Sequence, residues 1–401
     1  MIGSLGNINE VNRTIKVIMY DNYYEPNSFK IKSGETIKFV VVNAGELVHE
    51  FNIANAMMHK KHQPEMEKMV ENDGFKVDHR VFLEVEGSVP VTMSKSIGLG
   101  IIEFTNVYQQ LQPDMLLLIG DRYEALAAAI AGAYMNIPIA HVQGGEISGS
   151  IDESARHAIT KFSHLHFPAT QRSADYLVRM GEDPAHVHNV GCPAGDYIRE
   201  LDTDLPSNIF NQMGVGANID PEKPFLLVIY HPVTTNFGSE REQAEQLIGA
   251  LHDLAMPTVW LWPNIDAGSD NISKAIRVYR EKNSSGWLHL VKNLNPKVFQ
   301  KCLKKTVCAI GNSSSFVRDS TFSGTPVVLI GDRQDGREHG ENLTVVDPAA
   351  DQIKSAVKIQ LENGRHEPGA LYGDGNAGAR IIEKIKGFVP YSQKTLHYRY
   401  Q

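Results

Sequence analysis

The chain has 401 residues, of which 42% are hydrophobic and 21% charged, as in globular proteins of two or three domains. A formal net charge of −8 argues against nonspecific binding to nucleic acid or to an anionic membrane surface. Three cysteines, none of them in a CxxC motif, exclude a disulfide framework, and no apolar run approaches the roughly 20 residues of a membrane span. Without an apolar segment that could act as a signal peptide, we expect a reduced, cytoplasmic protein.

The first part of the chain predicts β-structure. Residues 13–53 are rich in Val, Ile, Phe and Thr and are interrupted by turn-forming pairs, whereas residues 56–70 have a helical composition. The run DNYYEPNSFKIKSGETIKFVVVNAGELVHEFNI, followed by MMHKKHQPEMEKM, resembles the front half of a cupredoxin. We therefore expect a β-rich, cupredoxin-like segment over residues 1–72.

A copper site is not expected in this segment. A type 1 site requires a cysteine thiolate, two histidines and usually a methionine. The chain has no cysteine before Cys192, so His49 lacks its partners and is interpreted as a structural residue. His59, His62 and Met66 are interpreted as part of a solvated helix face. We therefore expect no metal and no cofactor.

From residue 73 onward, strands and helices are predicted to alternate. The first half predicts strands at 76–85, 115–119, 137–142, 164–167 and 188–191, and helices at 90–110 and 173–180. After a polar linker at 200–223, further strands are predicted at 225–230, 258–262, 287–291, 306–310 and 326–330. Strand–helix–strand repeats of this length predict parallel sheets. We expect an α/β protein with two Rossmann-like lobes, at 73–205 and 206–380, and a tail at 381–401.

Four carboxylates follow the predicted strands of the first lobe. Asp121 follows one strand, Glu146 lies in the glycine-rich loop after the next, and Asp152 and Glu153 begin a helix. Open α/β sheets bind ligands at the carboxyl ends of their strands. Crowded carboxylates also raise one another's pKa, which suits general acid–base catalysis near neutral pH. The alternative for Asp152 is a helix start that forms an ion pair with Arg156, one turn away.

The second lobe has a predicted phosphate site at Gly311-Asn312-Ser313-Ser314-Ser315. This stretch follows a strand and opens a helix, where backbone N–H groups and hydroxyls converge on an anion. A serine that only caps the helix is the alternative. Neither GxGxxG nor GxxxxGK[ST] occurs, so dinucleotide and P-loop sites are not predicted. Further candidate ligands of a phosphate, ribose or base follow other strands of this lobe: His231, Asn264, Arg333, Arg337 and Asn342.

Several motifs together resemble the hydrolysing UDP-N-acetylglucosamine 2-epimerases, and most of all their sialic-acid-pathway branch. They extend from about residue 73 to the C-terminus: GDRYEALAAA, HVQGGEISGSIDESARHAITK, GCPAGD, YHPVTT, PNIDAGS, GNSSS, GDRQDGREHGENL and YGDGNA. The resemblance implies a GT-B-like fold, a UDP-sugar substrate, no cofactor, and a homodimer or homotetramer. The implied reaction removes the proton at sugar C2, expels UDP and adds water, giving N-acetylmannosamine and UDP.

The resemblance also implies roles for single residues. It places catalytic functions at Asp121, His141, Asp152, Glu153, Arg156 and His231, to which we add Glu146. It places UDP contacts at Asn264, Ser313, Ser314, Asp319 and Arg333, to which we add Arg122, Gln143 and Asn342 as substrate-binding candidates.

The chain departs from the family pattern in two places. Gln143 stands where the family often has Glu, in a HxEGGE-type motif. The family's first strand and its GTRxEYG-type loop are replaced by the cupredoxin-like segment. One possibility is that residues 13–20 or residues 36–43 take the place of the missing strand. The other is that the first lobe is incomplete and turnover is impaired. The alternatives are a UDP-diacetylbacillosamine 2-epimerase, a GT-B glycosyltransferase, and a non-catalytic fusion that binds copper and a nucleotide sugar.

Overall fold

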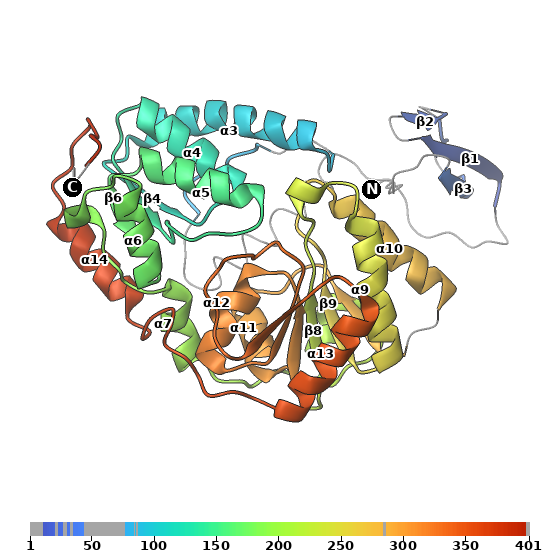
Figure 1. Ribbon diagram of the computed structural model, residues 1–401. Coiled ribbons are helices and arrows are strands. Elements are labelled where there is room, and N and C mark those ends of the chain that lie inside the picture. The colour runs from blue at the N-terminus through green and yellow to red at the C-terminus, as the bar shows by residue number, and fades with distance from the viewer. Residues whose placement is uncertain are drawn as a thin grey trace. The chain divides into compact units, whose positions relative to one another are not determined.

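The computed structural model divides into two compact units, Met1–Arg80 and Val81–Gln401. It describes residues 11–20, 23–26, 30–32, 35–43, 77–83, 85, 87–283 and 286–397. Both α/β lobes belong to the second unit (Figure 1). Within the described ranges, no helix is long and apolar enough to cross a membrane.

The described part of the first unit is a three-stranded sheet of order β2-β1-β3. β1 (Arg13–Tyr20) pairs antiparallel with β2 (Tyr23–Glu25) and parallel with β3 (Ile37–Asn43). Ile15 and Val17 form its small buried cluster. β1 and β3 are therefore partners of each other, and neither belongs to the sheet of the first lobe.

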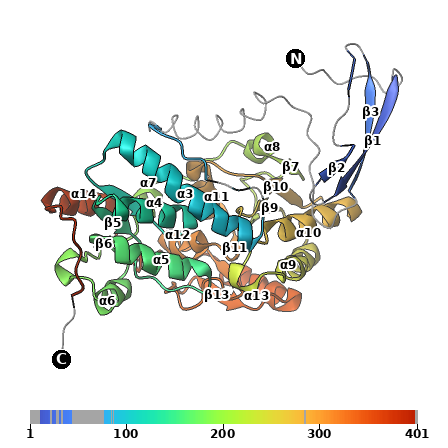
Figure 2. The ribbon, with the colours of Figure 1, turned by 90° about the horizontal axis from the view of Figure 1, so that it is seen from above.

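The first lobe is built on a parallel sheet of order β4-β5-β6. Its strands are β4 (Leu116–Ile119), β5 (Ile139–Val142) and β6 (Leu165–Phe167). One face packs against α3 (Pro90–Leu111), α4 (Tyr123–Tyr134) and α5 (Ile151–Phe162), with Ile139 and Ile159 fully buried between them. The other face is covered by α14 (Ala377–Gly387), so the C-terminal helix returns to this lobe (Figure 2). α6 (Gln171–Arg179) and α7 (Pro193–Glu200) complete the lobe.

β4 is one of the two edge strands of this three-stranded sheet. Leu117 and Ile119, on the face that α14 covers elsewhere, are 54% and 59% exposed. A parallel sheet is normally buried on both faces, so its strands are apolar throughout. The exposure of Leu117 and Ile119 is therefore consistent with a first lobe in which, among the described residues, no further strand pairs with β4 and no helix covers this part of the sheet.

The second lobe contains a seven-stranded sheet of order β13-β12-β11-β8-β9-β10-β7, antiparallel only at β7. Its strands are β7 (Gly214–Gly216), β8 (Leu226–Ile229), β9 (Thr258–Leu261), β10 (Leu288–Val291), β11 (Cys308–Gly311), β12 (Val327–Ile330) and β13 (Leu343–Val346). One face packs against α9 (Glu240–Leu254), α10 (Ser269–Lys282) and α13 (Ala350–Asn363). The other packs against α8 (Ile209–Met213), α11 (Pro296–Lys305) and α12 (Ser314–Ser323). The five central strands are buried on both faces, which explains their continuous apolar sequences.

Four local predictions were wrong. Residues 77–83 and 85 form no strand, and residues 188–191 form none, although Val187 makes a single bridge to His166. The predicted linker contains α8 and β7. The chain also continues after β12 into β13, whose residues Thr344 and Val345 are exposed because it is an edge strand. The histidines at positions 49, 59 and 62, with Met66, lie outside the described residues.

Candidate active site

A cleft of about 610 Å³ lies between the two lobes. The first lobe contributes the residues that follow β4 and the start of α5, and the second lobe contributes loops after β8, β9, β11 and β12. The predicted residues that line it are Asp121, Arg122, Asp152, His231, Asn264, Ser313, Ser314, Arg333 and Arg337. The lobes approach closely at Gly149, where an added Cβ would lie 1.8 Å from the carbonyl oxygen of Asp332.

Asp121 is held at the carboxyl end of β4 by Arg156 of α5. The Nε of Arg156 donates to Asp121 Oδ2 at 3.0 Å, and its Nη1 donates to the carbonyl oxygen of Glu146 at 2.6 Å. The Arg156 side chain is buried and does not line the cleft. Burial alone would raise the pKa of Asp121, but Arg156, Arg337 and Arg318 lower it well below its usual value. Asp121 is therefore an ionised carboxylate in the cleft wall.

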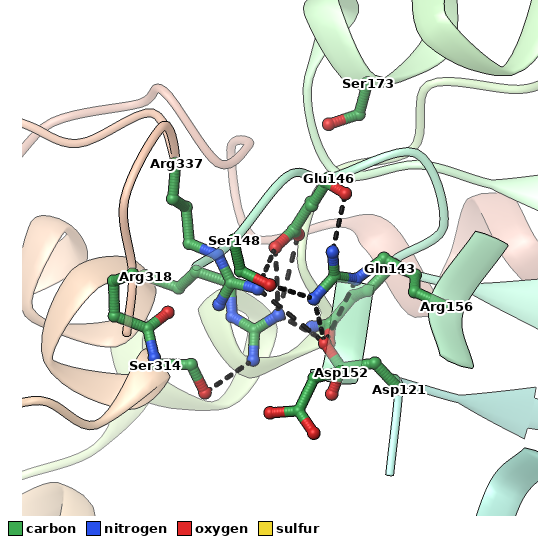
Figure 3. A network of polar contacts seen from close by, with 12 residues as sticks. Asp121, Gln143, Glu146, Ser148, Asp152, Arg156, Ser173, Ser314, Arg318 and Arg337 are labelled. Carbon is green, nitrogen blue, oxygen red and sulfur yellow. Dashed lines mark hydrogen bonds and ion pairs between the residues drawn. The ribbon is translucent and has the colours of Figure 1, made fainter. Parts of the chain in front are cut away.

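Glu146 joins the glycine-rich loop of the first lobe to two arginines of the second (Figure 3). Its Oε2 lies 3.2 Å from Arg337 Nη2 and 3.4 Å from Arg318 Nη1, and its side chain is 3% exposed. Burial would raise the pKa of Glu146, but Arg337, Arg318 and Arg156 lower it. Arg318 Nη1 also donates to Gln143 Oε1 at 2.9 Å. Glu146 and Gln143 thus hold the lobes together and lie behind the cleft, not in its wall.

Asp152 lies at the start of α5, and its pKa is shifted in the opposite direction from that of Asp121. Burial raises its pKa, and the nearby Asp121 adds to the effect, although Arg333 Nη2 lies 3.2 Å from its Oδ2. The cleft therefore contains one carboxylate with a lowered pKa and one with a raised pKa. Such a separation is what a base and an acid that act at one site require.

His231 follows β8 and is held as a neutral imidazole. Its Nδ1 accepts a hydrogen bond from the backbone N–H of Asn264 at 3.1 Å, which places the ring proton on Nε2. Burial, and then the charges of Arg333 and Arg122, lower its pKa well below the usual value. His231 can therefore donate a hydrogen bond into the cleft without carrying a charge.

The predicted phosphate site lies at the start of α12. Ser313 precedes the helix in an extended conformation and makes no side-chain cap, so the first N–H groups of α12 have no side-chain acceptor at the cap. Ser313 and Ser314 line the cleft, and Arg318, one turn later, donates to Ser314 Oγ at 3.2 Å. Among the described residues, no hydrogen-bond partner contacts the buried Arg318 Nε or the buried Arg337 Nε and Nη1. The second lobe thus lines the cleft with the uncapped start of α12, two serines and the Arg318 guanidinium, a set of donors suited to an anion.

The family model described as "UDP-N-acetylglucosamine 2-epimerase" matches residues 49–386. A UDP-N,N'-diacetylbacillosamine 2-epimerase (hydrolyzing) from Legionella pneumophila is 35% identical over 324 residues, which cover 81% of this chain and 84% of that protein. The chain belongs to the UDP-N-acetylglucosamine 2-epimerase family. A UDP-N-acetylglucosamine 2-epimerase from Neisseria meningitidis is 28% identical over 71% of this chain and 73% of that relative.

Solved structures of this family confirm the predicted fold class of two Rossmann-like, GT-B-like lobes. The UDP-GlcNAc 2-epimerase of Methanocaldococcus jannaschii, in complex with UDP-GlcNAc and UDP, has a TM-score of 0.68 at 17% identity, over 88% of this chain and 92% of that chain. The enzyme of Neisseria meningitidis bound to UDP-GlcNAc has a TM-score of 0.64 at 16% identity, over 94% and 100%. At these identities the likeness concerns the fold alone.

A second, shorter match supports the cupredoxin resemblance of the N-terminal segment. The copper-resistant cuproprotein CopI of Pseudomonas aeruginosa is 45% identical over 60 residues, which are 15% of this chain and 33% of that protein. The epimerase family therefore accounts for the α/β part of the chain, and a further 60-residue stretch is similar to part of CopI.

Several predicted site residues of this epimerase-family chain lie outside the cleft wall. His141 is fully buried in β5 and bonds through Nε2 to the carbonyl oxygen of Gly120 at 2.7 Å. Glu153 accepts from the backbone N–H of Ser148 at 2.7 Å. The others are bonded inside the second lobe: Asp319 accepts from Gln300 Nε2 at 2.7 Å, and Asn342 Nδ2 donates to Ser320 Oγ at 2.9 Å and to the carbonyl oxygen of Thr325 at 2.7 Å.

The sequence prediction omitted Arg318 and Glu124, which line the cleft. Arg318 follows Ser314 by four residues on α12, a spacing that puts both on one helix face. That spacing was the available signal. Nothing in the local sequence indicated that the side chain reaches the other lobe.

Proposed function

We propose that the chain is a hydrolysing 2-epimerase that converts UDP-N-acetylglucosamine to N-acetylmannosamine and UDP. The observation that carries the proposal is the pairing of two features in one cleft. Asp121 and Asp152, with pKa values shifted in opposite directions, face the donor-rich start of α12. A nucleotide sugar with its diphosphate at Ser313 and Ser314 would place its sugar toward the carboxylates of the first lobe.

In the proposed reaction, Asp121 is the base that removes the proton at C2. The bond between C1 and the diphosphate oxygen breaks, UDP leaves, and a C1–C2 double bond forms. Arg318, Arg333 and the neutral His231 would stabilise the negative charge that develops on UDP. Water then adds its hydroxyl to C1 and a proton returns to C2 from the opposite face, a step for which the raised pKa of Asp152 qualifies it.

UDP-N,N'-diacetylbacillosamine is the second candidate substrate. The Legionella pneumophila relative, whose name contains this substrate, is 35% identical and is covered over 84% of its length. A relative from Campylobacter jejuni named for the same sugar is 32% identical over 69% of its length. Both substrates share the 2-acetamido group and the diphosphate, so the same proton abstraction and elimination apply.

Incubation with each UDP-sugar in D2O, followed by proton NMR, tests the proposal. We expect UDP release and deuterium at C2 of the free 2-epimeric sugar, with the faster substrate identified by the ratio of kcat/KM values. Recovery of both UDP-sugars unchanged and undeuterated from folded protein would contradict the proposed activity. UDP titrated into the same sample by calorimetry then shows separately whether nucleotide binding remains.

A further inference from the structure

After α14 the chain runs back across the first lobe, and we call residues 388–397 the C-terminal strap. The carbonyl oxygen of Ser392 lies 3.2 Å from His164 Nε2, and the ring of Tyr391 makes an edge contact with that of His164 at a centroid distance of 5.0 Å. Further along, the backbone N–H of His397 donates to the carbonyl oxygen of Gly181 at 2.8 Å. The strap is thus attached to the lobe at several points.

Lys394 of the strap enters a buried charge cluster around Glu182. Lys394 Nζ lies 2.5 Å from Glu182 Oε2, Lys161 Nζ lies 2.8 Å from Oε1, and His166 Nε2 lies 3.0 Å from Oε2. The Glu182 side chain is 1% exposed. Burial would raise the pKa of Glu182, but His166, Lys161 and Lys394 lower it to about 2. A carboxylate buried this deeply requires such partners to remain charged.

The same ammonium group also binds the end of α5. Lys394 Nζ donates to the carbonyl oxygen of Thr160 at 2.8 Å and to that of Lys161 at 3.2 Å. Both carbonyls belong to the last turn of α5 (Ile151–Phe162), and that of Thr160 also accepts from the backbone N–H of Ser163 at 3.1 Å. A cation at this end also interacts favourably with the helix dipole. Lys394 therefore ties the last turn of α5 to Glu182.

The opposite end of α5 carries the residues that shape the cleft. Asp152 lies in its first turn, and Arg156, one turn later, holds Asp121. A helix of 12 residues is about 18 Å long, so a shift at one end is transmitted along a rigid rod to the other. The strap is absent from the cleft wall, so its effect on the site would pass through this helix.

We propose that Lys394 is a positioning residue that fixes α5, and with it Asp152 and Arg156, relative to the cleft. The part of the proposal that concerns catalysis rests on the proposed function. The part that concerns the position of α5 does not. The phosphate site lies in the second lobe, so loss of Lys394 should leave nucleotide binding intact.

Hydrogen–deuterium exchange of the full-length protein tests the position of α5 directly. In Lys394→Met we expect amides in the last turns of α5 to exchange about tenfold faster, as the loss of one or two hydrogen bonds predicts, with the central strands of the second lobe unchanged. Lys394→Arg keeps the cation and should restore slow exchange. Lys384→Met is the matched control, because Lys384 is a half-exposed lysine of α14 that pairs with Glu383 at 3.8 Å.

Turnover and UDP affinity give the second readout. For Lys394→Met we expect kcat on the UDP-sugar to fall several-fold, the dissociation constant of UDP to stay within twofold, and Lys394→Arg to recover kcat. Wild-type exchange in α5 of Lys394→Met would overturn the proposal whether or not the wild-type protein turns over substrate. Faster exchange in α5 with unchanged kcat in an active enzyme would overturn the catalytic part.

Discussion

Replacement of Arg318 by Met should weaken UDP binding much more than it weakens the fold. The substitution removes the 2.9 Å hydrogen bond to Gln143 and the contact with Glu146, while Glu146 keeps Arg337 at 3.2 Å. Arg318 lines the cleft beside Ser313 and Ser314, so its guanidinium is placed to bind a phosphate oxygen there. Hydrogen bonds to charged groups contribute about 1.5–3 kcal/mol. We therefore expect UDP affinity to fall about 10- to 150-fold.

Isothermal titration of UDP at pH 7, with a thermal melt of each variant, measures this effect. Arg318→Lys should be intermediate, because an ammonium keeps the charge but loses the planar set of donors. Arg241→Met is the control, since Arg241 is half exposed on α9 and pairs with Glu245 at 2.9 Å, one turn along the same helix. If Arg318→Met binds UDP within twofold of the wild type, the assignment of Arg318 to the anion site is wrong.

Three further predictions follow from the lobes and their contacts. Asp121→Asn should lower turnover by about 10²- to 10⁴-fold and leave UDP affinity nearly unchanged, and equal turnover in a coupled UDP-release assay would refute its role as the base. Gly149→Ala should lower the free energy of unfolding by about 1–3 kcal/mol in a denaturant titration, because the added Cβ would meet Asp332 O at 1.8 Å. Glu182→Gln should lower the free energy of unfolding by about 3 kcal/mol at pH 7. Since the pKa of Glu182 is lowered from 4.5 to about 2, its stabilisation is complete above pH 4.5 and is lost as the pH falls toward 2, so unfolding curves of variant and wild type should converge there.

The sequence predicted the central strands of both lobes because they are apolar runs bounded by turn residues. The strand predicted at 225–230 is β8, and those predicted at 258–262 and 326–330 contain β9 and β12. The prediction failed at residues 76–85, where a stretch of mixed polar and apolar residues, KVDHRVFLEV, forms no strand among the described residues. It also missed β13, an edge strand of only four residues that directly follows the polar loop after β12.

The sequence likewise predicted only some of the residues of the candidate site. Asp121, His231 and Ser313 could be grouped in advance, because they follow parallel strands and so lie at one edge of each sheet. Arg318 could not be grouped with them in advance, because its hydrogen bond to Gln143 depends on how the second lobe packs against the first. Gln143 itself has a φ of 65° and turns its side chain toward Cys192 and Arg318, away from the cleft, which no local pattern specifies.

The sequence by itself therefore determined the α/β architecture of two lobes, the family, and most of the polar residues of the cleft, since these follow from strand periodicity and from motifs at strand ends. Only the tertiary structure determined the pKa shifts of these residues and the side chains that hold them in place. Asp121 and Asp152 are the same residue type, yet Arg156 and Arg337 lower the pKa of one, and burial raises the pKa of the other. Through-space neighbours set these differences, and residues such as Arg156 and Lys394 reach their partners only when distant parts of the chain have packed together.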